Sequence, residues 1–319
     1  MLSVSVVLST YNGEKYIKEQ LDSLYMQTYS PDKIYISDDH STDSTVSIIK
    51  DYIEKRGINN WVLSINSNNC GWKKNFHKLL QQTKEDVVFL SDQDDIWNIN
   101  KIEIMLDNLK THPEAELIAC GYQPFYEDST KKVSKIITSR MVGTGSLNKI
   151  AFGPLFMNVL RPGCTFAVRR SLIESIEPYW DEKIPHDAMI WRFAVIKGSG
   201  YILDQALISW RRYDNSSSNP HHNKSLEESE NEIRYRNTIS GIESHLAFYA
   251  KAIEYCNERG LDDNTFNIIN EGRIFEQEYL EAVKSKSSIK ILQRGFKYRS
   301  HFLSRKTILA DMLMAILAR

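Results

Sequence analysis

Short apolar runs alternate with longer segments of helical periodicity over the first hundred residues of the chain. The apolar runs are β-prone and predict four strands, Val4–Leu8, Lys33–Ser37, Trp61–Ile65 and Val87–Leu90. The segments between them predict three helices, Glu14–Gln27, Thr42–Lys55 and Lys73–Gln82. Strands that alternate with helices form βαβ units, so the pattern predicts an α/β fold with a mixed, mainly parallel sheet flanked by helices.

The pattern changes twice in the rest of the chain. Apolar stretches at Leu117–Cys120 and Val133–Ile137 predict a hairpin. After it, one helix and three strands are expected, at Ala188–Ile196, Thr165–Val168, Tyr201–Leu203 and Leu207–Arg211. A Ser/Asn-rich loop at 215–222 is typical of a linker, and the sequence beyond it is helical. We therefore expect one domain over residues 1–215 and a helical C-terminal region over residues 216–319.

Polar clusters follow three of the predicted strands. They occupy residues 10–13, 38–43 and 92–95, after the first, second and fourth strands. Ligands of open α/β sheets bind beyond the carboxyl ends of the strands. The placement of the three clusters therefore predicts one shared binding site.

The cluster after the fourth strand brings together the carboxylates of Asp92, Asp94 and Asp95. Carboxylates this close raise one another's pKa, and leaving them without a compensating partner costs stability. A bound Mg²⁺ or Mn²⁺ removes this cost and keeps coordination sites for substrate phosphates. The alternative is a solvated acidic turn that caps the next helix, since Asp is a good N-cap residue. The cluster alone is consistent with either interpretation.

Composition narrows the class of protein without naming its chemistry. The 319 residues are 42% hydrophobic and 25% charged, which is ordinary for a globular protein. The formal net charge of −1 gives no overall attraction to nucleic acid. The four cysteines lack metal-ligand spacing and suit a reducing compartment. With no signal-peptide pattern and no apolar run of about 20 residues, we expect a cytoplasmic protein, soluble or peripheral to the membrane.

Four motifs taken together resemble the inverting family 2 glycosyltransferases, which have the Rossmann-like GT-A fold. They are Ser9–Gly13, Ser37–Asp43, Ser91–Trp97 and the pair His186-Asp187. The last two resemble the rhamnosyltransferase-like branch of bacterial polysaccharide biosynthesis. The resemblance covers roughly residues 1–215, and its motifs are specific as an ordered set.

The resemblance implies a nucleoside diphosphate sugar donor whose diphosphate is bound through Mn²⁺ or Mg²⁺. Asp94 would be the principal metal ligand. Asp92 would support the metal and contact the ribose. Asp95 is expected to cap the following helix, with contact to the metal as the alternative. The metal would act as a Lewis acid on the leaving diphosphate.

The nucleotide site implied by the resemblance draws on every polar cluster. Asp38 and Asp39 would face the base and ribose, with a solvated turn as the alternative. Arg211 would approach the diphosphate, but Tyr213 replaces the histidine common two positions later. The other wall of the site and a neighbouring loop would contribute Thr10, Tyr11, Asn12 and Asn75.

Asp187 matches the catalytic base of the family. Inverting transfer needs one carboxylate that accepts the proton of the acceptor hydroxyl. The alternative is that Asp187 only caps the helix after it. His186 and Trp97 would lie on the acceptor side of the site.

The C-terminal region carries a basic stretch followed by an apolar stripe. Residues 284–306 include eight Lys or Arg and no acidic residue, and apolar positions recur from Ile308 to Leu317. Such a segment is attracted to anionic lipid on the inner face of the cell membrane. Alternatively, the stripe docks on the catalytic domain or on a second copy of the chain in a homodimer.

Together these features predict transfer from dTDP-rhamnose to a hydroxyl of a growing, lipid-linked surface glycan, with inversion at the sugar. Two alternatives stay open. One is the same fold with a UDP-hexose or UDP-N-acetylhexosamine donor. The other is a non-catalytic module that binds nucleotide sugar or glycan.

Overall fold

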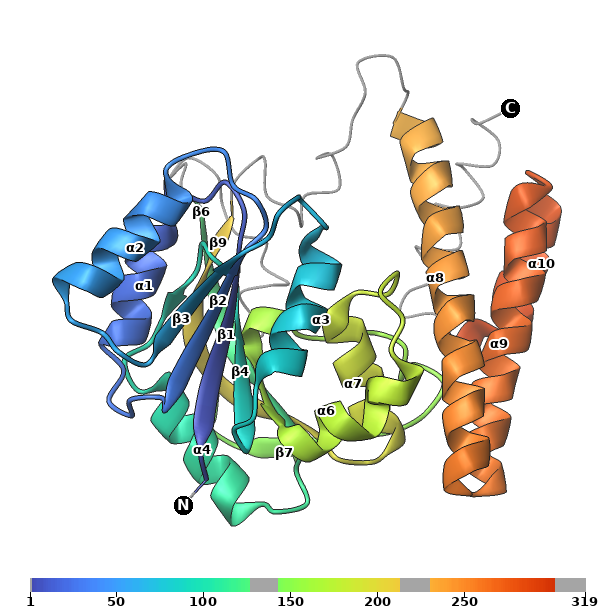
Figure 1. The fold of residues 1–319 in the computed structure, drawn as a ribbon. Coiled ribbons are helices and arrows are strands. Elements are labelled where there is room, and N and C mark those ends of the chain that lie inside the picture. Colours follow the sequence, from blue (N-terminus) through green and yellow to red (C-terminus); the bar gives the residue numbers. More distant parts are fainter. Residues whose placement is uncertain (1, 127–142, 213–229, 302–319) are drawn as a thin grey trace. The chain divides into compact units, whose positions relative to one another are not determined.

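A computed structural model describes residues 2–126, 143–212 and 230–301 (Figure 1). Several predictions from the sequence lie outside these residues. They are the second strand of the hairpin, Val133–Ile137, the linker at 215–222, Tyr213, and the apolar stripe from Ile308 to Leu317.

The N-terminal half of the sheet is parallel, as predicted. Its strands run in the order β3-β2-β1-β4. Thr10 pairs with Asp38 and Leu8 with Ser91, so the carboxyl ends of three strands lie at one edge. The strands are β1 (Val4–Thr10), β2 (Lys33–Asp38), β3 (Trp61–Ile65) and β4 (Val87–Ser91).

The other half of the sheet is mixed and continues the order as β8-β6-β9-β5, with β7 on β9. β8 is antiparallel to β4 and β6, and β6 is parallel to β9. Leu117 to Cys120, predicted as a hairpin arm, belongs to β6. These strands are β5 (Ile96–Trp97), β6 (Leu117–Tyr126), β7 (Leu147–Lys149), β8 (Phe166–Arg169) and β9 (Gly200–Arg212).

A register shift explains why β9 was predicted as two strands. Cys120 pairs with Leu203, but the next residue, Gly121, pairs with Ala206. A Cβ at position 121 would lie 2.9 Å from the carbonyl oxygen of Gln205, so the close approach requires glycine there. The extra residues form a bulge, which interrupts the apolar pattern without ending the strand.

Helices cover both faces of the sheet (Figure 1). α1 and α2 lie on one face, and α3 and α7 lie on the other. Alternate residues of β1, Val4, Val6 and Leu8, pack in one core cluster with Ile17 and Leu21 of α1. The helices of this part are α1 (Ile17–Tyr25), α2 (Thr45–Lys55), α3 (Trp72–Gln82), α4 (Lys101–Thr111), α6 (Arg170–Ile176) and α7 (His186–Ile196), with the 3₁₀ turns η1 (Gly163–Thr165) and η2 (Glu177–Tyr179).

The chain divides into two compact units. The second contains Ser217–Arg319 and also Ala151–Asn158 and Tyr179–Ile184, two segments from the range that the sequence analysis placed in the N-terminal domain. Within this unit, Phe156 packs against Phe248 with ring centres 6.4 Å apart. Its helices are α8 (Glu230–Arg259), α9 (Asp263–Lys284) and α10 (Ser288–Lys297), followed by the 3₁₀ turn η3 (Arg299–His301).

Part of the basic stretch lies within these helices and is paired. Arg294 and Lys297 both contact Glu278, at 3.0 and 3.2 Å. Ile289 and Phe296 of α10 are exposed. None of the described helices combines the length and apolar composition needed to cross a bilayer. Attachment to an anionic membrane surface and homodimer formation stay predictions.

Gly272 on α9 is expected to be intolerant of any side chain. A Cβ there would lie 2.3 Å from Oη of Tyr249 on α8, so Gly272→Ala should destabilise the protein by about 1–3 kcal/mol through overpacking. Gly241→Ala on α8 is the matched control, because nothing lies within 4 Å of a Cβ there. It should stabilise by up to about 1 kcal/mol through helix propensity. Urea unfolding measures both, and equal effects would contradict the prediction.

Candidate functional site

The loop after β1 is held against the acidic cluster by a residue that the sequence analysis missed, Gln93. Its Oε1 accepts from the backbone N–H of Tyr11 at 2.8 Å, and its Nε2 donates to the Tyr11 carbonyl at 3.0 Å. A Cβ on Gly13 would lie 2.4 Å from Gln93 Oε1, so the contact needs glycine. The ring of Tyr11 stays exposed. Asn12 joins this loop to the next by accepting from the N–H of Thr42 at 2.9 Å.

Asp38 connects the ends of β1 and β2. Its carboxylate accepts from Oγ1 of Thr10 at 2.8 Å and from both N–H and Oγ of Ser41, at 2.8 and 2.6 Å. Asp38 and Thr10 are buried. The structure therefore gives both residues an internal, supporting role, and their predicted contact with a nucleotide stays untested.

Asp39 organises the loop before α3. It accepts from the backbone N–H groups of Cys70 and Gly71, at 2.9 and 2.8 Å, and from Nδ2 of Asn66 at 2.9 Å. Burial acts to raise the pKa of Asp39, but these hydrogen bonds outweigh it and hold the pKa below its usual range. Asp39 is thus an ionised carboxylate at the carboxyl edge of the sheet.

Asn75 differs from its predicted role. It was expected to bind the nucleotide, but it is buried and its amide is saturated by protein. Its Nδ2 donates to Ser9 Oγ and to the Ser37 carbonyl, both at 2.8 Å. Its Oδ1 accepts from Ser37 Oγ at 2.6 Å and from Asn66 at 2.9 Å. An amide offers two donors and two lone pairs, so Asn75 ties α3 to β1 and β2 and has no capacity left for a ligand.

The acidic cluster is strongly perturbed. Burial, followed by the charges of Asp94 and Asp187, raises the pKa of Asp92 to about 7. Burial, with Asp94 and Asp92, raises the pKa of Asp95 well above its usual range. The charge of Asp187 contributes to the raised pKa of Asp92, so the predicted base interacts with a predicted metal ligand. The three clusters therefore lie together at the carboxyl edge of the sheet, and their role as one binding site stays a prediction.

Asp95 does not cap a helix, contrary to the sequence interpretation. The short strand β5 follows it, and α4 begins only at Lys101. Asp95 is buried, and its Oδ1 accepts from the backbone N–H of Arg211 at 3.2 Å. Its Oδ2 has no hydrogen-bond partner among the residues that the structure describes.

The donor set fits a hard divalent cation. The unpartnered Oδ2 of Asp95 and the crowded carboxylates are both relieved by added positive charge. Carboxylate oxygens are the ligands that Mg²⁺ and Mn²⁺ prefer. The Sγ of Cys164 lies within 4.8 Å of oxygens of Asp92 and Asp95. Burial raises the pKa of this thiol well above its usual range, so it stays protonated beside the carboxylates.

Arg211 also differs from its predicted role at the diphosphate. Its Nε donates to the Asp94 carbonyl at 2.9 Å, and its guanidinium pairs with Glu19 of α1. The group lies over the rings of Tyr16 and Phe125, 4.6 and 4.7 Å from their centres. Arg211 is buried by these contacts. Its hydrogen bonds to the Asp94 carbonyl and to the Asp95 carboxylate hold the acidic cluster in place.

Asp187 lies in the first turn of α7, after the cap position at Pro185, so it is not the N-cap. Its Oδ1 accepts from the N–H of Ala188 at 2.8 Å. His186 is buried and stacks on Phe76 with ring centres 3.9 Å apart. Burial lowers the pKa of His186 to about 4, which keeps the ring uncharged at neutral pH beside the predicted base.

Trp97 is not available to an acceptor. It is 3% exposed and packs in the core beneath the acidic cluster. The Nζ of Lys101 lies 3.1 Å from the centre of its ring. Lys101 is fully buried, and burial lowers its pKa to about 8. The sequence analysis missed Lys101, although it shares a helical face with the buried residues Met105 and Leu109.

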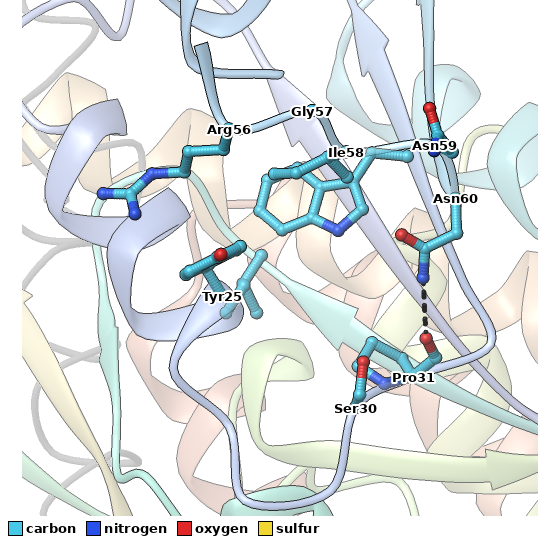
Figure 2. A pocket seen from close by; sticks show the side chains of 10 residues that line it. Tyr25, Ser30, Pro31, Arg56, Gly57, Ile58, Asn59 and Asn60 are labelled. Atoms are coloured by element: carbon cyan, nitrogen blue, oxygen red, sulfur yellow. Dashed lines mark hydrogen bonds between the residues drawn. The ribbon is translucent and has the colours of Figure 1, made fainter. Parts of the chain in front are cut away.

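A surface cavity of about 390 Å³ lies elsewhere, at the amino ends of β2 and β3 (Figure 2). Its lining includes Tyr25, Asn60 and Arg56, and Arg56 pairs with Asp22 at 3.0 Å. None of the described residues that line it carries a carboxylate. The cavity therefore lacks the groups for metal or base chemistry and is separate from the candidate site.

Comparison with known proteins identifies the matched part of the chain. A family model described as glycosyl transferase family 2 matches residues 5–176, which is more than half of the chain. A dTDP-rhamnosyl transferase, RfbG of Shigella flexneri, is 28% identical over 221 residues, covering 66% of this chain and 72% of that protein.

A second relative matches a shorter stretch of sequence, and two solved structures share the fold at 16% and 15% identity. TarS of Staphylococcus aureus, a poly(ribitol-phosphate) β-N-acetylglucosaminyltransferase, is 36% identical over 100 residues, 31% of this chain and 17% of TarS. Residues 1–349 of TarS in complex with UDP-GlcNAc superpose with a TM-score of 0.59 at 16% identity, covering 95% of this chain and 93% of that one. A mannosyltransferase of Pyrobaculum calidifontis, in complex with GDP-Man and Mn²⁺, gives 0.53 at 15% identity, covering 99% and 86%.

The raised pKa of Asp92 predicts a pH dependence of stability in metal-free protein. Between its usual value of 3.8 and about 7, the folded protein binds more protons than the unfolded chain. The free energy of unfolding should therefore fall as pH rises through this range. Asp92→Asn should remove part of the slope and raise the melting temperature at pH 8.

Thermal unfolding in EDTA from pH 4 to 8 measures this dependence, and added Mn²⁺ tests the metal. Wild-type protein should gain stability from Mn²⁺ at pH 8, whereas Asp92→Asn should gain little. Asp51→Asn, on the surface of α2, is the control and should behave as wild type. A slope unchanged by Asp92→Asn would contradict the interpretation.

Proposed function

The chain belongs to glycosyl transferase family 2, and we propose that it transfers rhamnose from dTDP-rhamnose to a glycan hydroxyl with inversion at the sugar. One observation carries the proposal. The 3₁₀ turn η1 contacts both parts of the site: a Cβ on Gly163 would lie 3.2 Å from Cβ of Asp187, and Sγ of Cys164 lies within 4.8 Å of a carboxylate oxygen of Asp92. This supports a single carboxylate base, Asp187, beside the candidate diphosphate site. That is the arrangement a one-step displacement requires.

The donor side of the site consists of the loops after β1 and β2 and the acidic cluster. Tyr11 offers an exposed ring for the base, with its backbone fixed by Gln93. Asp39 is an ionised acceptor for donor hydroxyls. Asp92 and Asp94 would hold Mn²⁺ or Mg²⁺, which would stabilise the charge of the leaving diphosphate as a Lewis acid.

Asp187 performs the proton transfer. The acceptor oxygen forms its bond to the anomeric carbon as the bond from that carbon to the diphosphate oxygen breaks, and the hydroxyl proton passes to the Asp187 carboxylate. The two bonds lie on opposite faces of the sugar, so the configuration inverts. His186 stays neutral beside Asp187 and packs on Phe76, so it adds no charge next to the base.

The choice of donor rests on the similarity to RfbG, which covers 66% of the chain. A UDP-GlcNAc donor is the second candidate, because TarS shares a 100-residue stretch at higher identity. The acceptor is proposed to be a growing, lipid-linked surface glycan, by analogy with the polysaccharide branch of the family.

Asp187→Asn separates catalysis from binding. Donor affinity, measured by calorimetry with Mn²⁺, should stay within a few-fold of wild type. Turnover should fall by about 100-fold or more, because general base catalysis contributes about 10²–10⁴-fold. Asp181→Asn, in the loop before α7, is the matched control and should keep wild-type turnover. Undiminished turnover of Asp187→Asn would remove this residue from the mechanism.

A donor panel tests the sugar. With Mn²⁺ and Mg²⁺, dTDP-rhamnose should be consumed faster than UDP-GlcNAc, UDP-glucose or UDP-galactose, as measured by release of nucleoside diphosphate. Preference for UDP-GlcNAc would select the second candidate. If the protein binds nucleotide sugar but turns over no donor, whichever glycan acceptor is supplied, it is a non-catalytic module.

A further inference from the structure

The 3₁₀ turn η1 lies between the base and the acidic cluster and contacts both. On one side, a Cβ on Gly163 would lie 2.8 Å from Nε2 of His186 and 3.2 Å from Cβ of Asp187, so the backbone of η1 packs directly on the start of α7. On the other side, the Sγ of Cys164 lies within 4.8 Å of carboxylate oxygens of Asp92 and Asp95. Two adjacent residues therefore span the gap across which transfer takes place.

A buried lysine holds this turn in place. The Nζ of Lys101 donates to the carbonyl oxygen of Cys164 at 2.9 Å. The same ammonium lies over the ring of Trp97, and 5.7 Å from the centre of the Phe89 ring. These contacts fix Lys101 between β4, β5 and η1. The aromatic rings of Trp97 and Phe89 therefore orient the Lys101 ammonium toward the Cys164 carbonyl.

Lys101 also supplies positive charge beneath the carboxylates. Its Nζ donates to the carbonyl of Cys164, whose Sγ lies within 4.8 Å of carboxylate oxygens of Asp92 and Asp95. Burial lowers the pKa of Lys101, and the two carboxylates act in the opposite direction. A buried ammonium is costly unless opposite charge and hydrogen-bond acceptors compensate it. Here the acidic cluster and the Cys164 carbonyl do so, and in return the lysine balances carboxylates that would otherwise repel one another.

We propose that Lys101 is a positioning residue for sugar transfer, which acts through the Cys164 carbonyl to fix η1 and so the spacing between Asp187 and the acidic cluster. The inference rests on the proposed function. Lys101 is fully buried, so its side chain would act through the protein and not by contact with a substrate. Its contribution is to the alignment of the base with the donor, and misplacement by about 1 Å can cost about 100-fold in rate.

The test compares Lys101→Met, which keeps the chain length and removes the ammonium, with Lys101→Arg, which keeps the charge. Lys197→Met is the control. Lys197 is partly buried and forms an ion pair with Glu116 at 2.6 Å, but it follows the C-terminal end of α7, away from Asp187. For each variant, kcat, KM for the donor, calorimetric donor affinity and melting temperature are measured.

Lys101→Met should lower kcat by about 100-fold while donor affinity stays within about threefold, and Lys101→Arg should recover part of kcat. Lys197→Met should lower the melting temperature but keep kcat. Unchanged kcat in Lys101→Met would overturn the inference. A parallel loss of donor affinity and melting temperature, without a selective fall in kcat, would also overturn it by showing a purely structural role.

Gly163→Ala tests the same turn from its other side and does not remove a charge from the core. It should displace η1 from α7 and again lower kcat more than donor affinity. Gly153→Ala, where nothing lies within 4 Å of a Cβ, is its control and should match wild type. Absence of transfer by wild-type protein from every nucleotide sugar would overturn the proposed function and this inference together. Active wild type with fully active Lys101→Met and Gly163→Ala would overturn only the inference.

Discussion

Electrostatic repulsion among carboxylates at the carboxyl edge of the sheet is the constraint around which the site is built. Asp92, Asp94 and Asp95 follow a buried strand, and Asp187 approaches them from α7. Asp95 is buried and Asp92 is partly buried, and the lower local dielectric strengthens the repulsion. The ammonium of Lys101 lies on the core side of the cluster, and the proposed divalent cation would add positive charge on the other side. The same tension that penalises the empty site therefore favours a metal-bound diphosphate.

The sheet makes this crowding possible by its register. Pairing of Thr10 with Asp38 brings the first two polar loops to one edge, and saturated hydrogen bonds then hold them there. Arg211 and Asn75 belong to this support. Both were expected to contact the ligand, and both are buried in contacts with protein, where they fix backbone instead. Among the predicted donor-binding residues, Tyr11 and Asn12 are exposed.

The fold could be predicted from the sequence because its signals are local. Strand lengths, helical spacing and the polar clusters gave the βαβ order and the edge at which the site lies. The family resemblance was confirmed for the same reason, since its motifs are these clusters. What failed depends on tertiary partners. The sequence placed Asp95 near a helix start but could not show that β9 would offer it the N–H of Arg211.

Lys101 and Trp97 show the same limit from opposite directions. Trp97 follows the acidic motif and was expected on the acceptor side of the site, but in β5 its side chain packs in the core. A lysine on a helix was passed over, although its place on the apolar face marked it as buried. The β9 bulge, too, depends on a glycine in another strand. In each case the deciding contact lies far away in the sequence.

The pairing of Gln93 with Tyr11 has a consequence for affinity. One side-chain amide satisfies both backbone groups of Tyr11, in the manner of a neighbouring strand, and so orders the loop before any nucleotide arrives. A loop that is already ordered loses less conformational entropy on binding, and that saving appears as tighter association without an added contact. Gln93 comes from the acidic segment itself. The shape of the loop after β1 and the position of the carboxylates are therefore fixed together, as one preorganised unit.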